Sequence, residues 1–278
     1  MNDTPCATPD RLGPPVGHIV VQRDGGVATI VIDAPHKRNS VDEAMLRALA
    51  QAAFLLGADD DIGMVVLRGA GGRAFCAGAD LDALCVPPLD VTVERLDRAL
   101  AEAVTALSAI PMPVVALIEG ACIGGGIHLA LCADVIIARD DAVFAIPAVQ
   151  SGMAYPLVAL RALVTRIGAA ATKDFLLFGR RWDARTAERH GLVQRRGDAA
   201  ALDVALAEMR ACVDRSPRAA TLAYKGLLNA IAAIVDTRSA GDADGDVAAQ
   251  LHRTFAAQRC YLPALAQLAA SRKTERCA

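Results

Sequence analysis

The sequence predicts an α/β fold, in which short strands alternate with loops and helices. Two apolar runs, residues 64–68 (MVVLR) and 114–118 (VVALI), have the length and the β-branched content of buried strands. Each run leads into a loop of small residues, and residues 92–110 carry apolar side chains at helical spacing. Repeated units of strand, loop and helix are typical of α/β proteins.

The first elements are a pair of strands and a helix. Residues 19–22 and 28–32 are predicted strands, separated by a turn that contains two glycines. A polar loop then leads to a helix that Ser40 or Asp42 can cap and that ends near Leu56.

The central elements surround the two apolar runs. After the strand at residues 64–67, two prolines within residues 86–90 interrupt regular structure. A Pro-Met-Pro segment ends the amphipathic helix at residues 92–110. The strand at residues 114–118, a run of three glycines and a short apolar helix follow.

The last third of the chain is mostly helical in its pattern. Short strands are predicted at residues 135–138 and 143–145, ahead of this region. Residues 183–193 are predicted to form a helix, a glycine stop and a short strand, which places His190 at a helix end. A further helix is expected over about residues 216–235.

These elements suggest three regions. Residues 1–16 are polar and contain Pro and Gly, so we expect a mobile arm. Residues 17–197 form the core, and residues 198–278 form a helical region in which an acidic hinge, residues 236–246, precedes a last helix, residues 247–271. The hinge lacks the glycine and glutamate positions of a calcium-binding loop, so no metal is expected there.

The composition argues against several classes of function. The formal net charge is −2 and 4% of the residues are aromatic, so we expect no nucleic-acid partner. None of the eight cysteines forms a CxxC pair and no Cys–His spacing predicts a metal site, which favours a reducing, cytoplasmic location. Because polar residues interrupt the longest apolar region and the N-terminus lacks an apolar core, we expect neither a membrane span nor a signal peptide.

The segment at residues 120–131 (GACIGGGIHLAL) carries the strongest chemical signal. Three consecutive glycines lie where a strand becomes a helix, so a ligand can approach the backbone closely. The first amides of a helix have no partners within it and favour negative charge, including charge that develops in a transition state. A Walker loop is excluded because no Lys-Ser/Thr follows, and a dinucleotide-binding fingerprint is excluded because Leu129 occupies the third glycine position.

A packing turn is the alternative interpretation, and a second loop argues against it. Residues 74–81 (AFCAGADL) also follow a predicted strand and are mostly small. Two strand ends of this kind can supply two convergent N–H donors, which is what an oxyanion hole requires.

The two segments, in this order, resemble the crotonase superfamily, the enoyl-CoA hydratase and isomerase family. The resemblance covers roughly residues 18–192 and, more loosely, the C-terminus. It implies a crotonase (ClpP-like) spiral of stacked ββα units with a C-terminal helical region that builds homotrimers or hexamers. It also implies an acyl-CoA thioester as the ligand, with coenzyme A entering as part of the substrate and no separate cofactor.

The resemblance also implies roles for residues of both loops. The thioester oxygen is expected between the backbone N–H groups of Ala77 and Gly125, and Gly78, Ala79 and Asp80 complete the substrate-binding loop.

Basic residues are candidates for the coenzyme A end of the substrate. Lys37 and Arg38 lie in the loop that touches coenzyme A in the family, so they could meet its phosphates; a solvated loop is the alternative. Lys273 is the nearest match to a basic residue that reaches the coenzyme A of a neighbouring subunit.

Two positions depart from the hydratases of the family. Those enzymes add water to the double bond with two glutamates, and His128 and Ala148 occupy the corresponding positions here. Because alanine cannot exchange protons, a two-carboxylate hydration mechanism cannot operate in this chain as it does in those enzymes.

Two other side chains could take part in the chemistry. His128 is either a neutral base or hydrogen-bond donor, or a histidine packed near the core. Tyr155 follows a glycine by three residues, which resembles the methylmalonyl-CoA decarboxylase branch, although Ala79 stands where that branch has a histidine. The alternative for Tyr155 is a ring that lines an acyl pocket.

Three functions therefore remain open. The first is an acyl-CoA enzyme that stabilises a thioester enolate, related to the hydratases but possessing the chemistry of a decarboxylase or another lyase that uses Tyr155 or His128. The second is a protein that binds acyl-CoA without turnover. The third is a structural relative without a ligand, which the intact small-residue loops disfavour.

Overall fold

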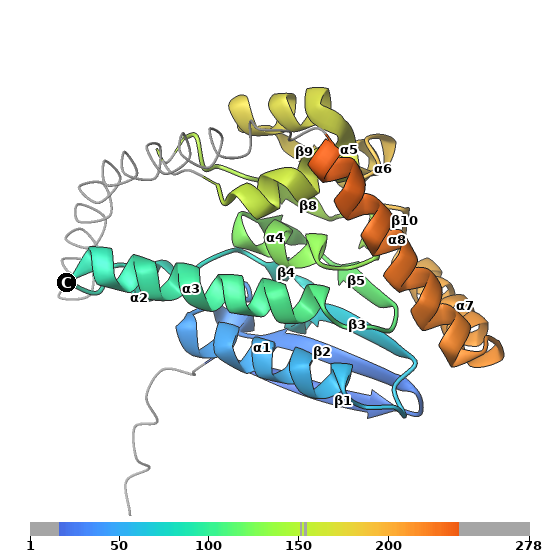
Figure 1. Cartoon of the computed structure of the whole chain (residues 1–278). Coiled ribbons are helices and arrows are strands. Elements are labelled where there is room, and N and C mark those ends of the chain that lie inside the picture. Colours follow the sequence, from blue (N-terminus) through green and yellow to red (C-terminus); the bar gives the residue numbers. More distant parts are fainter. Residues whose placement is uncertain (1–16, 151, 153–154, 239–278) are drawn as a thin grey trace, which may run out of the picture.

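The computed structural model describes residues 17–150, 152 and 155–238 (Figure 1). The predicted arm at residues 1–16, the last helix at residues 247–271 and residues 239–246 of the acidic hinge lie outside these residues.

The strands of the described residues form two sheets, with the orders β1-β2-β3-β5-β7-β10 and β4-β6-β8-β9. The strands are β1 (His18–Asp24), β2 (Val27–Asp33), β3 (Met64–Gly69), β4 (Ala74–Cys76), β5 (Val114–Ile118), β6 (Ala121–Ile123), β7 (Val135–Arg139), β8 (Val143–Ala145), β9 (Arg181–Asp183) and β10 (Arg195–Gly197). The β1–β2 and β8–β9 pairs are antiparallel, and the other pairs are parallel.

Helices follow the strands in a regular way. They are α1 (Glu43–Gly57), α2 (Leu81–Leu84), α3 (Leu89–Ser108), α4 (Gly125–Leu131), α5 (Leu157–Leu177), α6 (Ala184–Arg189), α7 (Ala199–Arg215) and α8 (Arg218–Arg238), with short 3-10 turns at Pro35–Lys37 and Ala70–Gly72. Asp42 caps α1 as predicted, because its carboxylate accepts a hydrogen bond from the Met45 amide at 2.8 Å.

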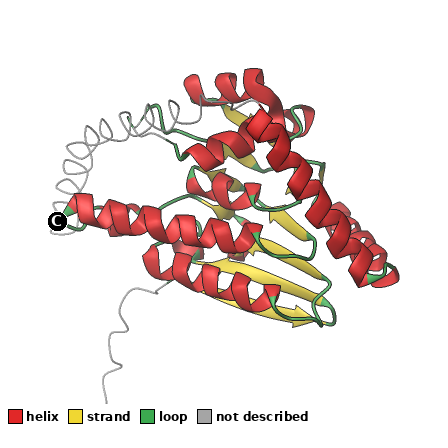
Figure 2. Ribbon diagram, viewed as in Figure 1, coloured by secondary structure: helices red, strands yellow, loops and turns green. Residues whose placement is uncertain are grey.

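From β3 to β8, consecutive strands alternate between the two sheets, and this alternation makes the fold a spiral. The strands β3, β5 and β7 are neighbours in the larger sheet, while β4, β6 and β8 follow the same order in the smaller one. Each pair leads into helical structure, and Figure 2 shows the strands stacked in successive layers beside their helices. The predicted α/β class and the ββα spiral are confirmed.

Both faces of the larger sheet are covered, so its strands are apolar throughout. Val65 and Leu67 of β3 belong to the main core beside α1 and α3, whereas Met64 and Val66 point the other way and pack near Leu202 of α7. Figure 1 shows α1, α3 and α4 stacked along one side, with α7 and α8 apart from them.

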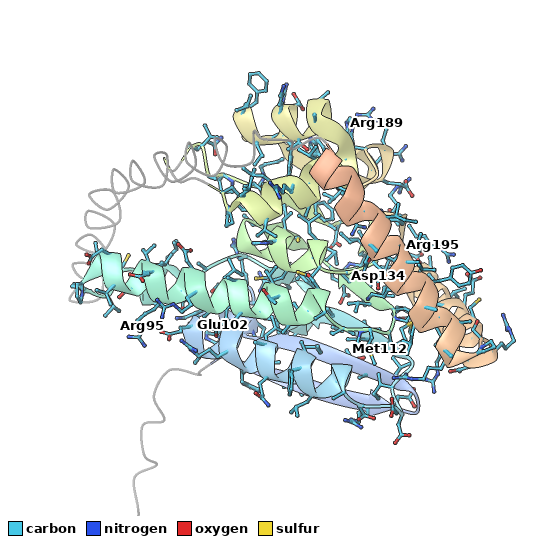
Figure 3. The ribbon with its side chains drawn as sticks, viewed as in Figure 1. Arg95, Glu102, Met112, Asp134, Arg189 and Arg195 are labelled. Carbon is cyan, nitrogen blue, oxygen red and sulfur yellow. The ribbon has the colours of Figure 1, made fainter. Side chains whose placement is uncertain are left out.

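Helix α8 is attached to this core through Lys225, whose side chain is 10% exposed. Lys225 donates hydrogen bonds to the Met112 carbonyl at 2.9 Å and to the Asp134 carboxylate at 2.7 Å. Figure 3 labels both acceptors beside the helix. No helix in the described part of the chain has the combined length and apolar character needed to cross a bilayer.

The structure differs from the sequence prediction in its shortest elements. The strands β4 and β6 lie in segments that were predicted as loops, because three residues are too few to show an alternating pattern. Helix α3 begins at Leu89 rather than at residue 92, since Pro88 takes the N-cap position with a φ of −73° that suits it.

Candidate active site

Two positions of the glycine turn before α4 require glycine, each for a different reason, and the position between them supplies a free amide. Gly124 has φ 53° and ψ −116°, which other residues rarely adopt. A Cβ on Gly126 would lie 2.3 Å from the Cys76 carbonyl oxygen, so this position allows no side chain. Gly125 is the first residue of α4, and its amide therefore has no acceptor within the helix.

The loop at residues 77–80 is held by backbone hydrogen bonds to the segment at residues 38–41. The Ala77 amide donates to the Arg38 carbonyl at 3.1 Å, and the Val41 amide donates to the Gly78 carbonyl at 2.9 Å. The Asp80 amide completes the set by donating to the Val41 carbonyl at 2.8 Å. These bonds determine which amides of the loop remain available to a ligand.

The prediction that the Ala77 amide is an oxyanion donor is wrong, because this amide already donates its hydrogen bond to the Arg38 carbonyl. The Ala79 amide has no acceptor among the described residues, and neither has the Gly125 amide. A Cβ built on Gly125 would lie 3.7 Å from Cα of Gly78 and 4.0 Å from the Ala79 nitrogen, so the two loops meet here. The structure therefore pairs Ala79, rather than Ala77, with Gly125.

A buried asparagine keeps the segment before Val41 in place. The Asn39 side chain donates to the carbonyl oxygens of Ala70 at 2.9 Å and Ala74 at 2.7 Å, and it accepts from the Ala34 amide at 2.9 Å. Its exposed fraction is 0% and its φ is 57°. Asn39 thus joins the loop that carries Arg38 to the strand that leads into residues 77–80.

Both unpartnered amides lie on a cavity of about 610 Å³, a volume common for small-molecule sites. Its wall is largely apolar, with Val41 and Leu96 among the contributing side chains. Every predicted site residue that the structure describes lies on this cavity, and so does Ala148. Lys273 lies outside the described residues.

His128 reaches the cavity wall in a packed state. Its exposed fraction is 3%, and neither ring nitrogen has a hydrogen-bond partner or contact with solvent in the described structure. Burial lowers the pKa of the imidazole to about 4, so the ring is neutral near pH 7. This environment favours the interpretation of His128 as a histidine packed near the core rather than as a base or hydrogen-bond donor. A proton transfer would require the ring nitrogens to become accessible.

Tyr155 lies beside His128, with ring centroids 6.0 Å apart. Its hydroxyl donates a hydrogen bond to the Gly124 carbonyl at 2.8 Å, and burial raises the pKa of that hydroxyl. The phenolic proton is therefore engaged in a hydrogen bond to the glycine turn. This contact makes Tyr155 a support for the turn that presents the Gly125 amide.

The two basic candidates near the cavity mouth differ in their surroundings. Lys37 is bound by Asp80 at 2.5 Å and by Asp82 at 3.5 Å, and the hydrogen bond to Asp80 raises the pKa of the ammonium. Asp80 also caps α2 through the Asp82 amide at 2.9 Å, so Lys37 and Asp80 join the two loops. Arg38 is exposed and has no ion-pair partner within the described chain, which leaves its guanidinium available to an anion.

A carboxylate that the sequence did not single out also lies on the cavity. Asp97 of α3 lines it together with Val93, Leu96 and Leu100, the apolar side chains on the same face of the helix. Partial desolvation raises the pKa of Asp97 to about 6. The available signal was an acid inside an otherwise apolar helical stripe, since Asp97 follows Val93 by four residues.

Comparisons with known proteins agree with this geometry. The model of the enoyl-CoA hydratase/isomerase family matches residues 22–260. A Mycobacterium tuberculosis protein named as a probable enoyl-CoA hydratase, EchA14, is 36% identical over 217 residues, which cover 77% of this chain and 82% of that protein. A Mycobacterium bovis protein named as a probable enoyl-CoA hydratase, echA8, is 35% identical over 185 residues, covering 64% and 67% of the two chains.

Solved structures share the fold as well as part of the sequence. That of an enoyl-CoA hydratase/carnithine racemase from Magnetospirillum magneticum is similar with a TM-score of 0.74 and 29% identity, over 78% of this chain and 82% of that one. The match of the family model over most of the chain, with the two small-residue loops meeting at one cavity, shows that this protein belongs to the enoyl-CoA hydratase/isomerase family of the crotonase superfamily.

Proposed function

We propose that the protein binds an acyl-CoA thioester with the carbonyl oxygen between the amides of Ala79 and Gly125. The observation that carries this proposal is the pair of unpartnered amides where two loops meet on an apolar cavity. The apolar wall would take the acyl chain. The exposed Arg38 at the same cavity would take a phosphate of coenzyme A.

Two backbone donors at the thioester oxygen suit reactions that pass through an enolate. When a bond at the carbon next to the carbonyl breaks, negative charge moves to that oxygen, where both N–H groups can bind it. We propose that the protein is an enzyme of this kind, a lyase or isomerase, and that hydration by the two-glutamate route is not its reaction. His128 and Ala148 stand where that route needs carboxylates.

Crotonyl-CoA is expected to be hydrated slowly or not at all, because neither residue can supply the carboxylate that positions and deprotonates water. The loss of absorbance of the enoyl thioester on mixing with enzyme measures this rate. Hydration at ordinary enzymatic turnover, on the order of 10²–10³ per second, would contradict the expectation.

The identity of the reaction is tested by incubation with a panel of enoyl-CoA and malonyl-type CoA esters, followed by mass spectrometry. Loss of carbon dioxide from a malonyl-type ester would support the alternative of a decarboxylase, which requires an oxyanion hole more than a strong base. Binding by calorimetry without any product would support the other alternative, a non-catalytic acyl-CoA-binding protein. The packed ring of His128 and the hydroxyl of Tyr155, which is hydrogen-bonded to Gly124, favour the alternative of a binding protein over that of a decarboxylase.

Substituting Tyr155 by Phe should slow the best substrate of the panel by about fivefold, because one neutral hydrogen bond is worth about 1 kcal/mol. The substitution removes the hydrogen bond to Gly124 and loosens the turn, with little change in affinity for the ester. His128→Gln is the matched comparison on the same cavity. A loss on the order of 10²-fold for His128→Gln would instead restore the histidine as an acid or base.

We propose further that the protein assembles as a homotrimer or a hexamer in the cytoplasm. Support comes from apolar side chains exposed along α8, namely Tyr224, Leu227, Leu228 and Ile231. Sedimentation equilibrium measures the mass of the assembly, and a monomer at micromolar concentration would contradict it.

A further inference from the structure

We infer that Asp97 is the catalytic acid–base group of this site, taking a proton from the acyl chain and returning it. The inference rests on the proposed binding of an acyl-CoA thioester. It gives the cavity a carboxylate on a different wall from the positions of His128 and Ala148, since Asp97 belongs to α3.

Asp97 is an exposed residue of α3 on the face of the helix that lines the cavity. Val93, Leu96 and Leu100 line the cavity, and residues three and four apart share a face of a helix. Asp97 lies between them on this face and lines the cavity as they do. Because Asp97 is exposed on the cavity side of the helix, its carboxylate can meet a ligand that enters the cavity, and a raised pKa at a cavity is typical of functional groups.

The other charged side chains along this part of α3 are paired. Arg95 contacts Glu43 of α1 at 2.8 Å, and Glu102 contacts Arg47 of α1 at 3.2 Å. Figure 3 labels Arg95 and Glu102 on the side of α3 next to α1. Within the described residues, by contrast, the carboxylate of Asp97 has no hydrogen bond and no ion pair, so it is available to a ligand.

The remaining titratable groups on the cavity are unsuited to proton transfer near neutral pH. Those facing it from the other elements are Lys37, Arg38, Asp80, Asp82, His128 and Tyr155. Lys37 is ion-paired with Asp80 and Asp82, and the guanidinium of Arg38 is permanently charged. Burial keeps the imidazole neutral and the phenol protonated. Asp97, whose pKa is raised to about 6, is mostly ionised at pH 7 and still basic enough to accept a proton.

The step balances without any further reactant. The carboxylate of Asp97 takes a proton from the carbon next to the thioester carbonyl, and the electron pair of the broken C–H bond forms the enolate. The amides of Ala79 and Gly125 bind the charge on the enolate oxygen. The carboxyl group then returns a proton to carbon, after exchange with solvent where the solvent is D₂O.

Deuterium exchange into butanoyl-CoA tests this step directly, because it requires only enolate formation and leaves the rest of the molecule unchanged. Wild-type protein in D₂O should label the carbon next to the carbonyl, as read by mass spectrometry. Asp97→Asn should lower the exchange rate by about 10²-fold or more, with the dissociation constant nearly unchanged. Glu94→Gln, on the same helix and exposed beside Arg98, is the matched control and should exchange at the wild-type rate.

The pH profile separates proton transfer from a merely structural role. The wild-type exchange rate should rise with pH through about 6 and then level off, whereas Asp97→Asn should lack that rise. Unchanged exchange in Asp97→Asn, or a weakened dissociation constant with unchanged maximal rate, would overturn the inference. If wild-type protein binds butanoyl-CoA and exchanges nothing, the acid–base role fails while the proposed binding stands; if it binds no ester of the panel, both fail.

A stability measurement tests the isolated carboxylate without any ligand. The folded protein holds the proton of Asp97 more tightly than the unfolded chain does, because the pKa rises from 3.8 to about 6. Below pH 3.8 the carboxyl group is protonated in both states and does not oppose folding. As the pH rises through about 6, the ionised carboxylate destabilises the folded state. Asp97→Asn should raise the Tm above about pH 7 and leave it unchanged below about pH 4. A difference in Tm that does not vary with pH would count against the inference.

Discussion

Replacing Gly125 by proline should lower turnover of the best acyl-CoA substrate by about 10²–10³-fold, the usual effect of losing one oxyanion donor. Proline has no N–H group, so the thioester oxygen would keep only the Ala79 amide. The fold should survive, because proline is well tolerated at the first position of a helix, where the amide has no helical acceptor. Steady-state kinetics and circular dichroism together measure both effects.

The control for this experiment is Gly125→Ala, which keeps the amide. A Cβ at this position would make ordinary contacts, the nearest at 3.7 Å from Cα of Gly78, so the loss should be far smaller than with proline. Folded Gly125→Pro protein with full turnover would show that this amide does not bind the reacting oxygen.

Replacing Asn39 by alanine should lower the free energy of unfolding by roughly 3–5 kcal/mol, because it leaves two buried backbone groups and one partly buried group without partners. These are the Ala34 amide and the carbonyl oxygens of Ala70 and Ala74. Urea denaturation measures the change. Acyl-CoA affinity should fall too, since the neighbouring segment holds the loop that carries Ala79.

The matched control is His36→Ala in the same loop. His36 is exposed, so its removal should change the free energy of unfolding by less than about 0.5 kcal/mol. A loss below about 1 kcal/mol for Asn39→Ala would mean that water or a shifted loop satisfies the three groups as well as the amide does.

The sequence could not predict which alanine of the loop, Ala77 or Ala79, has an amide available to a ligand. In the segment AFCAGADL both alanines are small and both belong to the loop. The amide that remains available is decided by acceptors about forty residues earlier, because the Arg38 carbonyl takes the Ala77 amide. Nothing in the loop itself encodes that bond.

The strands β4 and β6 illustrate the same limit at the level of the fold. Each has three residues and pairs in parallel with a segment far along the chain, as Ala121 does with Ala74. Their neighbours β3 and β5 were predicted because longer apolar runs need no partner to be recognised. The second sheet, which brings the two loops together, therefore emerges only from tertiary pairing.

The sequence by itself determined the α/β class, the two small-residue loops and the absence of carboxylates at residues 128 and 148, since these depend on residue type and local spacing. Only the tertiary structure decided that the Ala79 amide is available, that the hydroxyl of Tyr155 is bound to Gly124 and that Asp97 faces the cavity. Availability of a polar group depends on which partners the rest of the chain brings within hydrogen-bond distance. That is a property of packing between distant segments, and local sequence does not carry it.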